Sequence, residues 1–229
     1  MAYSALLFDL DDTLLDFAAA EDIALKQLHA NFFVPHAEEK HMKTLFHKIN
    51  RALWHLVSMQ KKKPQDVSEE RFVQLLEALR APLDPKELAL HYEKALSEQL
   101  VWFEGAQEAV KKLAQKHKIG VITNGLRSVQ ERKYENGTMH EWCSCFIISE
   151  KVGISKPHPK IFQMAFEELE ISPHETLMIG DSLESDFQGA INCNIDFCWI
   201  NRKNLDLPKH FPPPKITLQS VMHLPSCLS

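Results

Sequence analysis

The sequence predicts an α/β protein in which a doubly wound parallel sheet forms the core and an α-helical cap is inserted into it. Three observations lead to this prediction. A short apolar run at the start of the chain ends in acidic residues, residues 16–100 carry helical periodicity, and residues 106–200 alternate between helical and strand patterns. Strands that alternate with helices form parallel sheets through right-handed crossovers. At 229 residues the chain is long enough for one core domain with a substantial insertion.

Residues 4–8 form the first predicted strand, and three acidic residues follow it almost at once. Asp9, Asp11 and Asp12 come directly after a run of apolar side chains. This pattern is expected where a parallel strand reaches the carboxyl edge of an α/β sheet, which is the edge where such folds bind ligands. Carboxylates so close together repel one another unless a cation lies among them, and Mg²⁺ prefers oxygen ligands. We therefore expect a magnesium site at this strand end.

Residues 16–100 are predicted to form a helical cap of about four helices. Apolar side chains recur there at helical spacing in two stripes, and prolines separate the periodic stretches. The stripes are Leu45, Ile49, Leu53 and Leu56, and then Phe72, Leu75, Leu76 and Leu79. We expect Ser68 to be the N-cap of the helix that carries the second stripe. Each apolar face would be buried against its neighbours in a helical bundle.

Residues 101–229 are predicted to complete the core together with residues 1–15. Helices are expected over residues 106–118 and from His158 to Leu169. The further predicted strands are residues 119–123, 146–149, 176–179 and 197–200. Because the first strand joins the same parallel sheet, the cap is an insertion into a single core.

Composition and charge exclude several classes of protein. A net charge of −5 gives no electrostatic footprint for nucleic acid, and the basic run Lys61 to Lys63 is interpreted as a solvated loop. The opening apolar run is too short for a membrane span or a signal peptide, so we expect a cytoplasmic protein with no membrane partner. Five scattered cysteines do not form a disulfide framework, and buried free thiols are the favoured interpretation.

Polar residues follow four of the predicted strands. Asp9 and Asp11 follow the first, Thr123 ends the second, and Lys156 lies a few residues beyond the third. Asp181 and Asp186 come after the strand that ends at Ile179. The carboxyl ends of parallel strands meet at one edge of the sheet, so these side chains should lie together. Each of them alone would have an ordinary structural role, such as a helix-start carboxylate or a surface lysine.

These residues resemble the four motifs of the haloacid dehalogenase-like hydrolases. The motifs are Asp9-x-Asp11-x-Thr13, the strand ending in Thr123, Lys156-Pro157, and Gly180-Asp181 with Asp186 five residues later. More narrowly, several segments are similar to the pyrimidine 5′-nucleotidase branch of that superfamily. They are Asp12–Phe17, Ile49–Trp54, Arg71–Phe72, Ile122–Gly125, Ser149–Gly153, Ile179–Leu183 and Cys198–Trp199.

The resemblance implies a magnesium-dependent phosphomonoester hydrolase, with a nucleoside 5′-monophosphate as the expected substrate. It assigns Asp9 as the nucleophile that forms an aspartyl phosphate and Asp11 as the general acid and base. The Asp9 carboxylate, the backbone carbonyl of Asp11 and the Asp181 carboxylate would hold Mg²⁺. Phosphate oxygens would be bound by Lys156 and by Thr123 with the neighbouring Asn124. Asp186 would orient Lys156 or a water on the metal.

In the cap, the resemblance places Phe17, Asn50 and Trp54 near the sugar and base of the substrate. From the residues alone, a core aromatic of the bundle is the commoner role for Trp54, and Asn50 and Arg71 could be groups on a helix surface. Cap closure over the reaction is expected because an aspartyl phosphate must be shielded from water. Its hinges should lie near Asp16 and near Glu104-Gly105.

Other functions are weighed against the nucleotidase interpretation. A dehalogenase of the same superfamily needs no acid at the position of Asp11, because a halide leaves without a proton. A sugar-phosphate phosphatase or a phosphomutase would use the same core. A non-catalytic phosphate-binding protein would have little physical reason to retain Asp9, Asp11, Thr123, Lys156 and Asp181 together. The expected partner is a small phosphate ester, and for the nucleotidase interpretation it is a nucleotide.

Overall fold

A computed structural model of the protein describes residues 3–59 and 61–228. Within these residues, the core is a six-stranded sheet in the order β3-β2-β1-β4-β5-β6, and every neighbouring pair is parallel. The strands are β1 (Ala5–Phe8), β2 (Lys118–Thr123), β3 (Cys145–Ile148), β4 (Thr176–Gly180), β5 (Asp196–Ile200) and β6 (Ile216–Leu218). The predicted doubly wound parallel sheet with a helical insertion is confirmed.

The first strand lies at the centre of the sheet, and its register positions the residues that follow it. Phe8 pairs with Val121 of β2 on one side and with Ile179 of β4 on the other. Asp9 therefore leaves the sheet level with the ends of both neighbouring strands, and its backbone N–H donates to the Ile179 carbonyl at 2.9 Å. The three strand ends that carry candidate residues meet at one edge.

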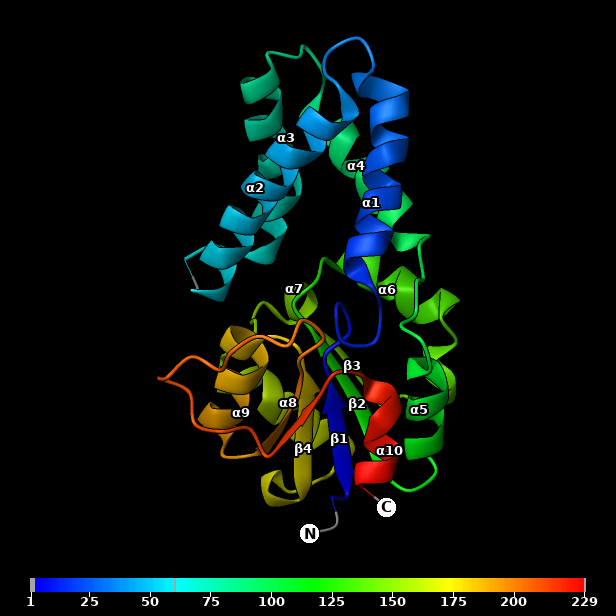
Figure 1. Ribbon diagram of the computed structural model, residues 1–229, viewed down its shortest axis with the longest axis vertical. Coiled ribbons are helices and arrows are strands. Elements are labelled where there is room, and N and C mark those ends of the chain that lie inside the picture. The colour runs from blue at the N-terminus through cyan, green and yellow to red at the C-terminus, as the bar shows by residue number, and fades with distance from the viewer. Residues whose placement is uncertain (1–2, 60, 229) are drawn as a thin grey trace.

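Helices cover both faces of the sheet (Figure 1). They are α5 (Ala106–Leu113), α6 (Arg127–Asn136), α7 (Ser149–Val152), α8 (Pro159–Leu169), α9 (Gln188–Cys193) and α10 (Leu224–Cys227). Leu6 and Phe8 of β1 pack on one face with Val110 of α5, while Leu7 packs on the other face with Phe162 of α8. This alternation explains why the first strand is apolar throughout, because both of its faces are buried.

Four longer helices form the inserted layer, which stands above the carboxyl edge of the sheet in Figure 1. They are α1 (Phe17–Leu28), α2 (Glu39–Ser58), α3 (Pro64–Leu79) and α4 (Pro85–Ser97), and a π-helical turn, η1 (His29–Phe33), extends α1. Their apolar faces meet in a cluster that includes Leu25, Phe46, Phe72 and Tyr92. The same cluster includes Val129 of α6, so the helical layer also packs against the core.

The chain enters and leaves the helical layer through two segments that lie side by side. The backbone N–H of Asp16 donates to the Val101 carbonyl at 2.7 Å, and that of Phe103 donates to the Leu14 carbonyl at 3.0 Å. We keep residues 16–100 as the proposed cap and the paired crossing as its proposed hinge region. Among the described residues, no helix has the length and apolar character needed to cross a membrane.

The structure corrects one sequence-based expectation about the fold and adds two elements that were not predicted. Helix α3 begins at Pro64 and not after Ser68, because the Asp66 carboxylate caps the Lys63 N–H at 3.2 Å and proline suits the first helical position. Helix α6 was not predicted, since it has no continuous apolar stripe. Strand β6 was also missed, because it is a three-residue edge strand.

Candidate active site

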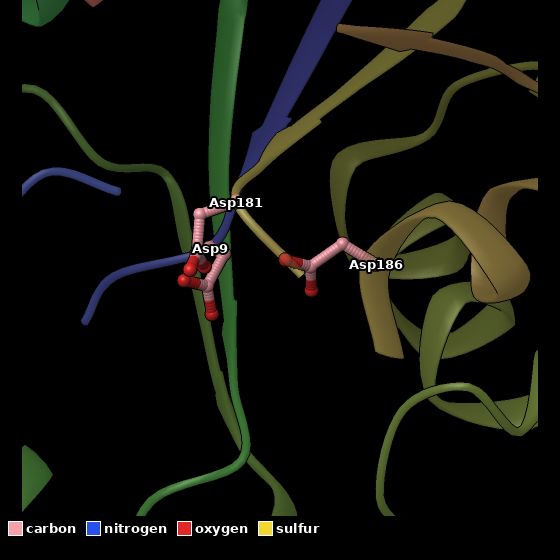
Figure 2. Close-up of side chains that lie close together, drawn as sticks. All are labelled: Asp9, Asp181 and Asp186. Atoms are coloured by element: carbon pink, nitrogen blue, oxygen red, sulfur yellow. The ribbon is translucent and has the colours of Figure 1, made fainter. Parts of the chain in front are cut away.

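Asp9, Asp181 and Asp186 bring their carboxyl groups together at the carboxyl edge of the sheet. One oxygen from each of them lies within 4.8 Å of the others. Figure 2 shows Asp9 and Asp181 side by side at the ends of their strands, with Asp186 pointing toward them from the segment that follows β4. Asp186 lies in a π-helical turn, η4 (Leu183–Phe187). Gly180 makes this approach possible, because a Cβ there would lie 2.2 Å from the Asp186 carboxylate.

Lys156 lies in the middle of this acidic group and is almost completely buried. Its Nζ donates to Asp9 Oδ1 at 2.6 Å, to Asp186 Oδ1 at 2.7 Å and to the Ile122 carbonyl at 2.6 Å. Asn124 fixes the lysine backbone from both sides, since its amide donates to the Lys156 carbonyl at 3.0 Å and accepts from the Lys156 N–H at 2.8 Å. The ammonium group therefore has a partner for each of its three donors.

The charges of this group are unbalanced. Burial raises the pKa of Asp9 to about 7, although Lys156 acts in the opposite direction. Burial also raises the pKa of Asp181 well above its usual range, and repulsion from Asp9 and Asp186 adds to this effect. Burial by itself would lower the pKa of Lys156, but the carboxylates of Asp186 and Asp9 raise it, so the amine stays charged. One ammonium thus faces three carboxyl groups, and these oxygen ligands fit a divalent cation.

Thr13 connects the loop after β1 to the loop after β4. The Asp181 N–H donates to the Thr13 hydroxyl at 3.1 Å, and Thr13 is fully buried. Arg202 holds the same loop from outside, because its Nη2 donates to the Thr13 carbonyl at 2.7 Å. The Trp199 indole N–H donates to the Asp181 carbonyl at 3.0 Å. These contacts fix the relative positions of Asp9 and Asp181.

Asp11 is held by two side chains of α6 that sequence reasoning missed. Gln130 Nε2 donates to Asp11 Oδ2 at 2.7 Å, and Lys133 Nζ donates to Asp11 Oδ1 at 2.6 Å. Both α6 side chains are buried. Gly125 leaves room for Gln130, since a Cβ at Gly125 would lie 2.0 Å from the Gln130 amide nitrogen. In the sequence, these residues could have been suspected only because α6 begins a few residues after the strand that ends at Thr123.

A cavity of about 230 Å³ lies between the sheet edge and the helical layer. From the core it is lined by Asp9, Asp11, Thr123, Asn124, Lys156, Asp181 and Asp186, among others, which brings together every core residue predicted for the site. From the helical layer it is lined by Phe17, Trp54, Arg71 and Leu96. Polar groups at one end and apolar walls at the other suit a small molecule with one charged group.

Asn50 is the predicted site residue that the structure does not bring to this cavity. Its side chain is buried within the helical layer, where its Nδ2 donates to Glu21 Oε1 at 3.2 Å. Tyr92 donates to the same carboxylate oxygen at 2.7 Å. The Asn50 amide therefore donates to a buried carboxylate inside the helical layer, and Asn50 does not line the cavity. The alternative that Asn50 and Arg71 are ordinary helix-surface groups does not hold either, because both are buried.

Comparisons with known proteins agree with this arrangement. The model of the haloacid dehalogenase-like hydrolase family matches residues 6–200. YfnB of Bacillus subtilis, named as a HAD-hydrolase, is 32% identical over 200 residues, which are 87% of this chain and 84% of YfnB. The crystal structure of YfnB bound to magnesium, described as revealing interdomain movement, has a TM-score of 0.89 at 30% identity and covers 100% of both chains.

Two further relatives carry names that specify a substrate. PynA of Streptococcus pneumoniae, a pyrimidine 5′-nucleotidase, is 33% identical over 208 residues, which are 90% of this chain and 87% of PynA. The glyceraldehyde 3-phosphate phosphatase of Pyrococcus abyssi is 28% identical over 199 residues, which are 85% of this chain and 80% of that enzyme.

Proposed function

Because the chain belongs to the haloacid dehalogenase-like hydrolase family, we propose that it is a phosphatase of small phosphate monoesters that requires Mg²⁺. The observation that carries this proposal is the buried contact of Lys156 with both Asp9 and Asp186, beside Asp181 and in the same cavity that Asp11 lines. More narrowly, we propose a nucleoside 5′-monophosphate as the substrate.

Asp9 is the proposed nucleophile. Its carboxylate oxygen attacks phosphorus, the bond from phosphorus to the ester oxygen breaks, and an aspartyl phosphate forms. Lys156 supplies positive charge beside Asp9, and the Thr123 hydroxyl lines the phosphate end of the cavity. The Asp9 carboxylate, the Asp181 carboxylate and the backbone carbonyl of Asp11 would hold Mg²⁺, which when bound offsets the charge that otherwise repels an anionic nucleophile. Asp186 orients Lys156.

Asp11 is the proposed general acid and base. Its carboxyl gives a proton to the leaving alkoxide in the first step. In the second step it removes a proton from water, the water oxygen attacks phosphorus, and the bond from phosphorus to Asp9 breaks to release inorganic phosphate. Gln130 and Lys133 keep the carboxyl of Asp11 in one orientation during both steps. A fixed acid next to a separate nucleophile supports hydrolysis of an ester whose leaving group needs a proton.

The nucleotidase proposal is supported by the walls of the cavity and by the relative PynA. Phe17 and Trp54 offer aromatic surface, on which a base can stack, at the cap end of the cavity. The second candidate is a sugar-phosphate phosphatase, which the similarity to the Pyrococcus abyssi enzyme favours. The two candidates share every step at Asp9 and Asp11 and differ only in what the cap contacts.

Phosphate release from 4-nitrophenyl phosphate tests the reaction itself. We expect release that needs Mg²⁺ and that falls by at least about 10³-fold in Asp9→Asn, as when a nucleophile is removed from other hydrolases. Asp206→Asn, an exposed aspartate far along the chain, is the matched control and should keep full activity. Release that survives in Asp9→Asn would refute the proposal.

A panel of nucleoside monophosphates and sugar phosphates tests the substrate. The expected preference is for a nucleoside 5′-monophosphate, and Trp54→Ala should reduce that activity more than activity on 4-nitrophenyl phosphate. Equal losses for both esters would mean that Trp54 has only a packing role. A preference for sugar phosphates would favour the second candidate.

A further inference from the structure

Arg71 of α3 is buried in the helical layer with part of its guanidinium unsatisfied. Only 2% of the residue is exposed. Its Nε and Nη2 atoms are buried and have no hydrogen-bond partner among the described residues. The nearest carboxylate oxygen, Glu93 Oε1, lies 3.6 Å from Nη2, which is longer than a hydrogen bond. Buried donors of a charged group are costly when unpaired, so this position needs an explanation.

Aromatic rings hold the guanidinium group in place. Its Cζ lies 4.4 Å from the ring centre of Tyr92, 5.5 Å from that of Phe72 and 5.9 Å from that of Phe46. Cation–π contacts of this kind fix a guanidinium without using its N–H donors. The arginine is therefore positioned by packing, while its Nε and Nη2 donors have no acceptor among the described residues.

Arg71 faces the cavity that contains Asp9. It lines this cavity together with Phe17, Trp54 and Leu96, at the end formed by the helical layer. A phosphate ester bound at Asp9 would extend its leaving group toward this end. The Arg71 guanidinium would then lie beside the part of the substrate that distinguishes one ester from another.

The surrounding charges favour a neutral leaving group over an anionic one. Glu93 lies beside Arg71 and accepts hydrogen bonds from Ser68 and, at 2.5 Å, from Ser128 of α6. Glu21 is also buried, and its carboxylate accepts a hydrogen bond from the Tyr92 hydroxyl at 2.7 Å. A carboxylate on the substrate would become a third anion next to one guanidinium. A carbonyl oxygen or a ring nitrogen would take the same hydrogen bonds without this repulsion.

We propose that Arg71 determines specificity by donating hydrogen bonds to the acceptor edge of a neutral, planar ring within the leaving group, such as the base of a pyrimidine nucleoside. This inference rests on the proposed phosphatase function. The planar fork of a guanidinium can reach two adjacent acceptors, such as the carbonyl oxygen and ring nitrogen of cytosine, whereas a lysine cannot. Phe17 and Trp54 supply apolar walls for the ring.

The test compares Arg71→Lys with the wild type on three esters: cytidine 5′-monophosphate, ribose 5-phosphate and 4-nitrophenyl phosphate. Arg71→Lys keeps the positive charge but loses the fork. The expected result is a fall in kcat/KM of about 10- to 100-fold for the nucleotide and less than about 2-fold for the other two esters. Arg80→Met, an exposed arginine at the end of the same helix, should change none of the three values.

Three other outcomes are informative. Equal losses on all three esters would show that Arg71 only stabilises the cap, and this would overturn the inference. If 3-phosphoglycerate, assayed as a fourth ester, depended strongly on Arg71 while the nucleotide did not, the inference would be overturned in favour of a carboxylate ligand. If the wild type released phosphate from none of the esters, the proposed function itself would fail, and this result is distinct from a failure at Arg71.

Discussion

Lys156 in the core and Arg71 in the helical layer are both buried cations in the wall of one cavity, but they differ in how their donors are used. All three donors of Lys156 have acceptors within hydrogen-bond distance. Two nitrogen atoms of Arg71 have none among the described residues. The core cation is therefore fully paired within the protein, whereas the role proposed for Arg71 requires acceptors that a substrate would supply.

Lys156→Met should have the largest effect, because it removes the one ammonium from the acidic group. We expect activity on every ester to fall by at least about 10³-fold, as when a group that stabilises charge in the transition state is lost. The protein should also lose about 3–5 kcal/mol of unfolding free energy, since Asp9 and Asp186 are left unpaired. Substrate assays and urea unfolding measure the two effects.

Lys160→Met is the matched control for this variant, because Lys160 is exposed in α8. It should change neither activity nor stability. If Lys156→Met reduced activity on some esters and not on others, it would contradict the view that core residues act on every ester and that cap residues distinguish between them.

Lys133→Met should have the next largest effect. Without Lys133, Asp11 keeps only Gln130 as a partner, and its carboxyl is no longer held in one orientation. We expect kcat to fall by about 10- to 100-fold, within the range of general acid and base catalysis, and by the same factor for every ester. Arg132→Met, an exposed position on the same helix, serves as the control. Unchanged kcat values would remove Lys133 from the mechanism.

Magnesium should stabilise the protein in a pH-dependent manner. Without the metal, burial raises the pKa of Asp9 from its ordinary value of 3.8 to about 7, so the folded protein holds this proton more tightly than the unfolded chain. The contribution of protonated Asp9 to the free energy of unfolding is therefore fully present below pH 3.8. It is lost as the pH rises through the folded-state pKa of about 7. Bound Mg²⁺ should replace the proton, so we expect added magnesium to raise Tm by more at pH 8 than at pH 5.

Thermal unfolding with and without MgCl₂ at both pH values measures this difference. Asp181→Asn, which removes a proposed ligand, should reduce the magnesium effect at pH 8. A magnesium effect of equal size at both pH values would argue against binding by these carboxylates.

Glu93→Gln should have the smallest effect, and it tests the charge argument for the cap. Removing the carboxylate beside Arg71 makes this end of the cavity more positive. We expect kcat/KM for 3-phosphoglycerate to rise by about 2- to 5-fold relative to cytidine 5′-monophosphate, consistent with a charge contact of modest energy. Glu87→Gln, exposed on the same helix, is the control. A fall in the relative rate for 3-phosphoglycerate would contradict the charge argument.

The core residues of the site could be predicted from the sequence, because their geometry follows from sheet topology. Asp9, Thr123 and Asp181 each follow an apolar strand, and parallel strands end at a common edge. Lys156 lies eight residues after the end of β3, so it was predicted from its place in the order of the four family motifs and not from a strand end. The structure adds the hydrogen bonds that position these residues, such as the contact of Thr13 with the Asp181 N–H.

The residues contributed by helices could not be predicted in the same way. Gln130 and Lys133 lie in a helix whose sequence is almost entirely polar, so the pattern gave no buried face. Arg71 and Asn50 have residue types typical of a surface, yet the packing of α1 to α4 buries both of them. Burial of a polar side chain depends on partners from other helices, here Tyr92 and Glu21, and a single helix sequence does not specify them.

The most direct test of the division between core and cap is the selectivity ratio, which is kcat/KM for cytidine 5′-monophosphate divided by kcat/KM for 4-nitrophenyl phosphate. It should be measured for the wild type, Lys133→Met and Arg71→Lys. We predict that the ratio is unchanged in Lys133→Met, although both rates fall, and that it drops by about 10-fold or more in Arg71→Lys. A changed ratio in the core variant, or an unchanged ratio in the cap variant, would contradict this account.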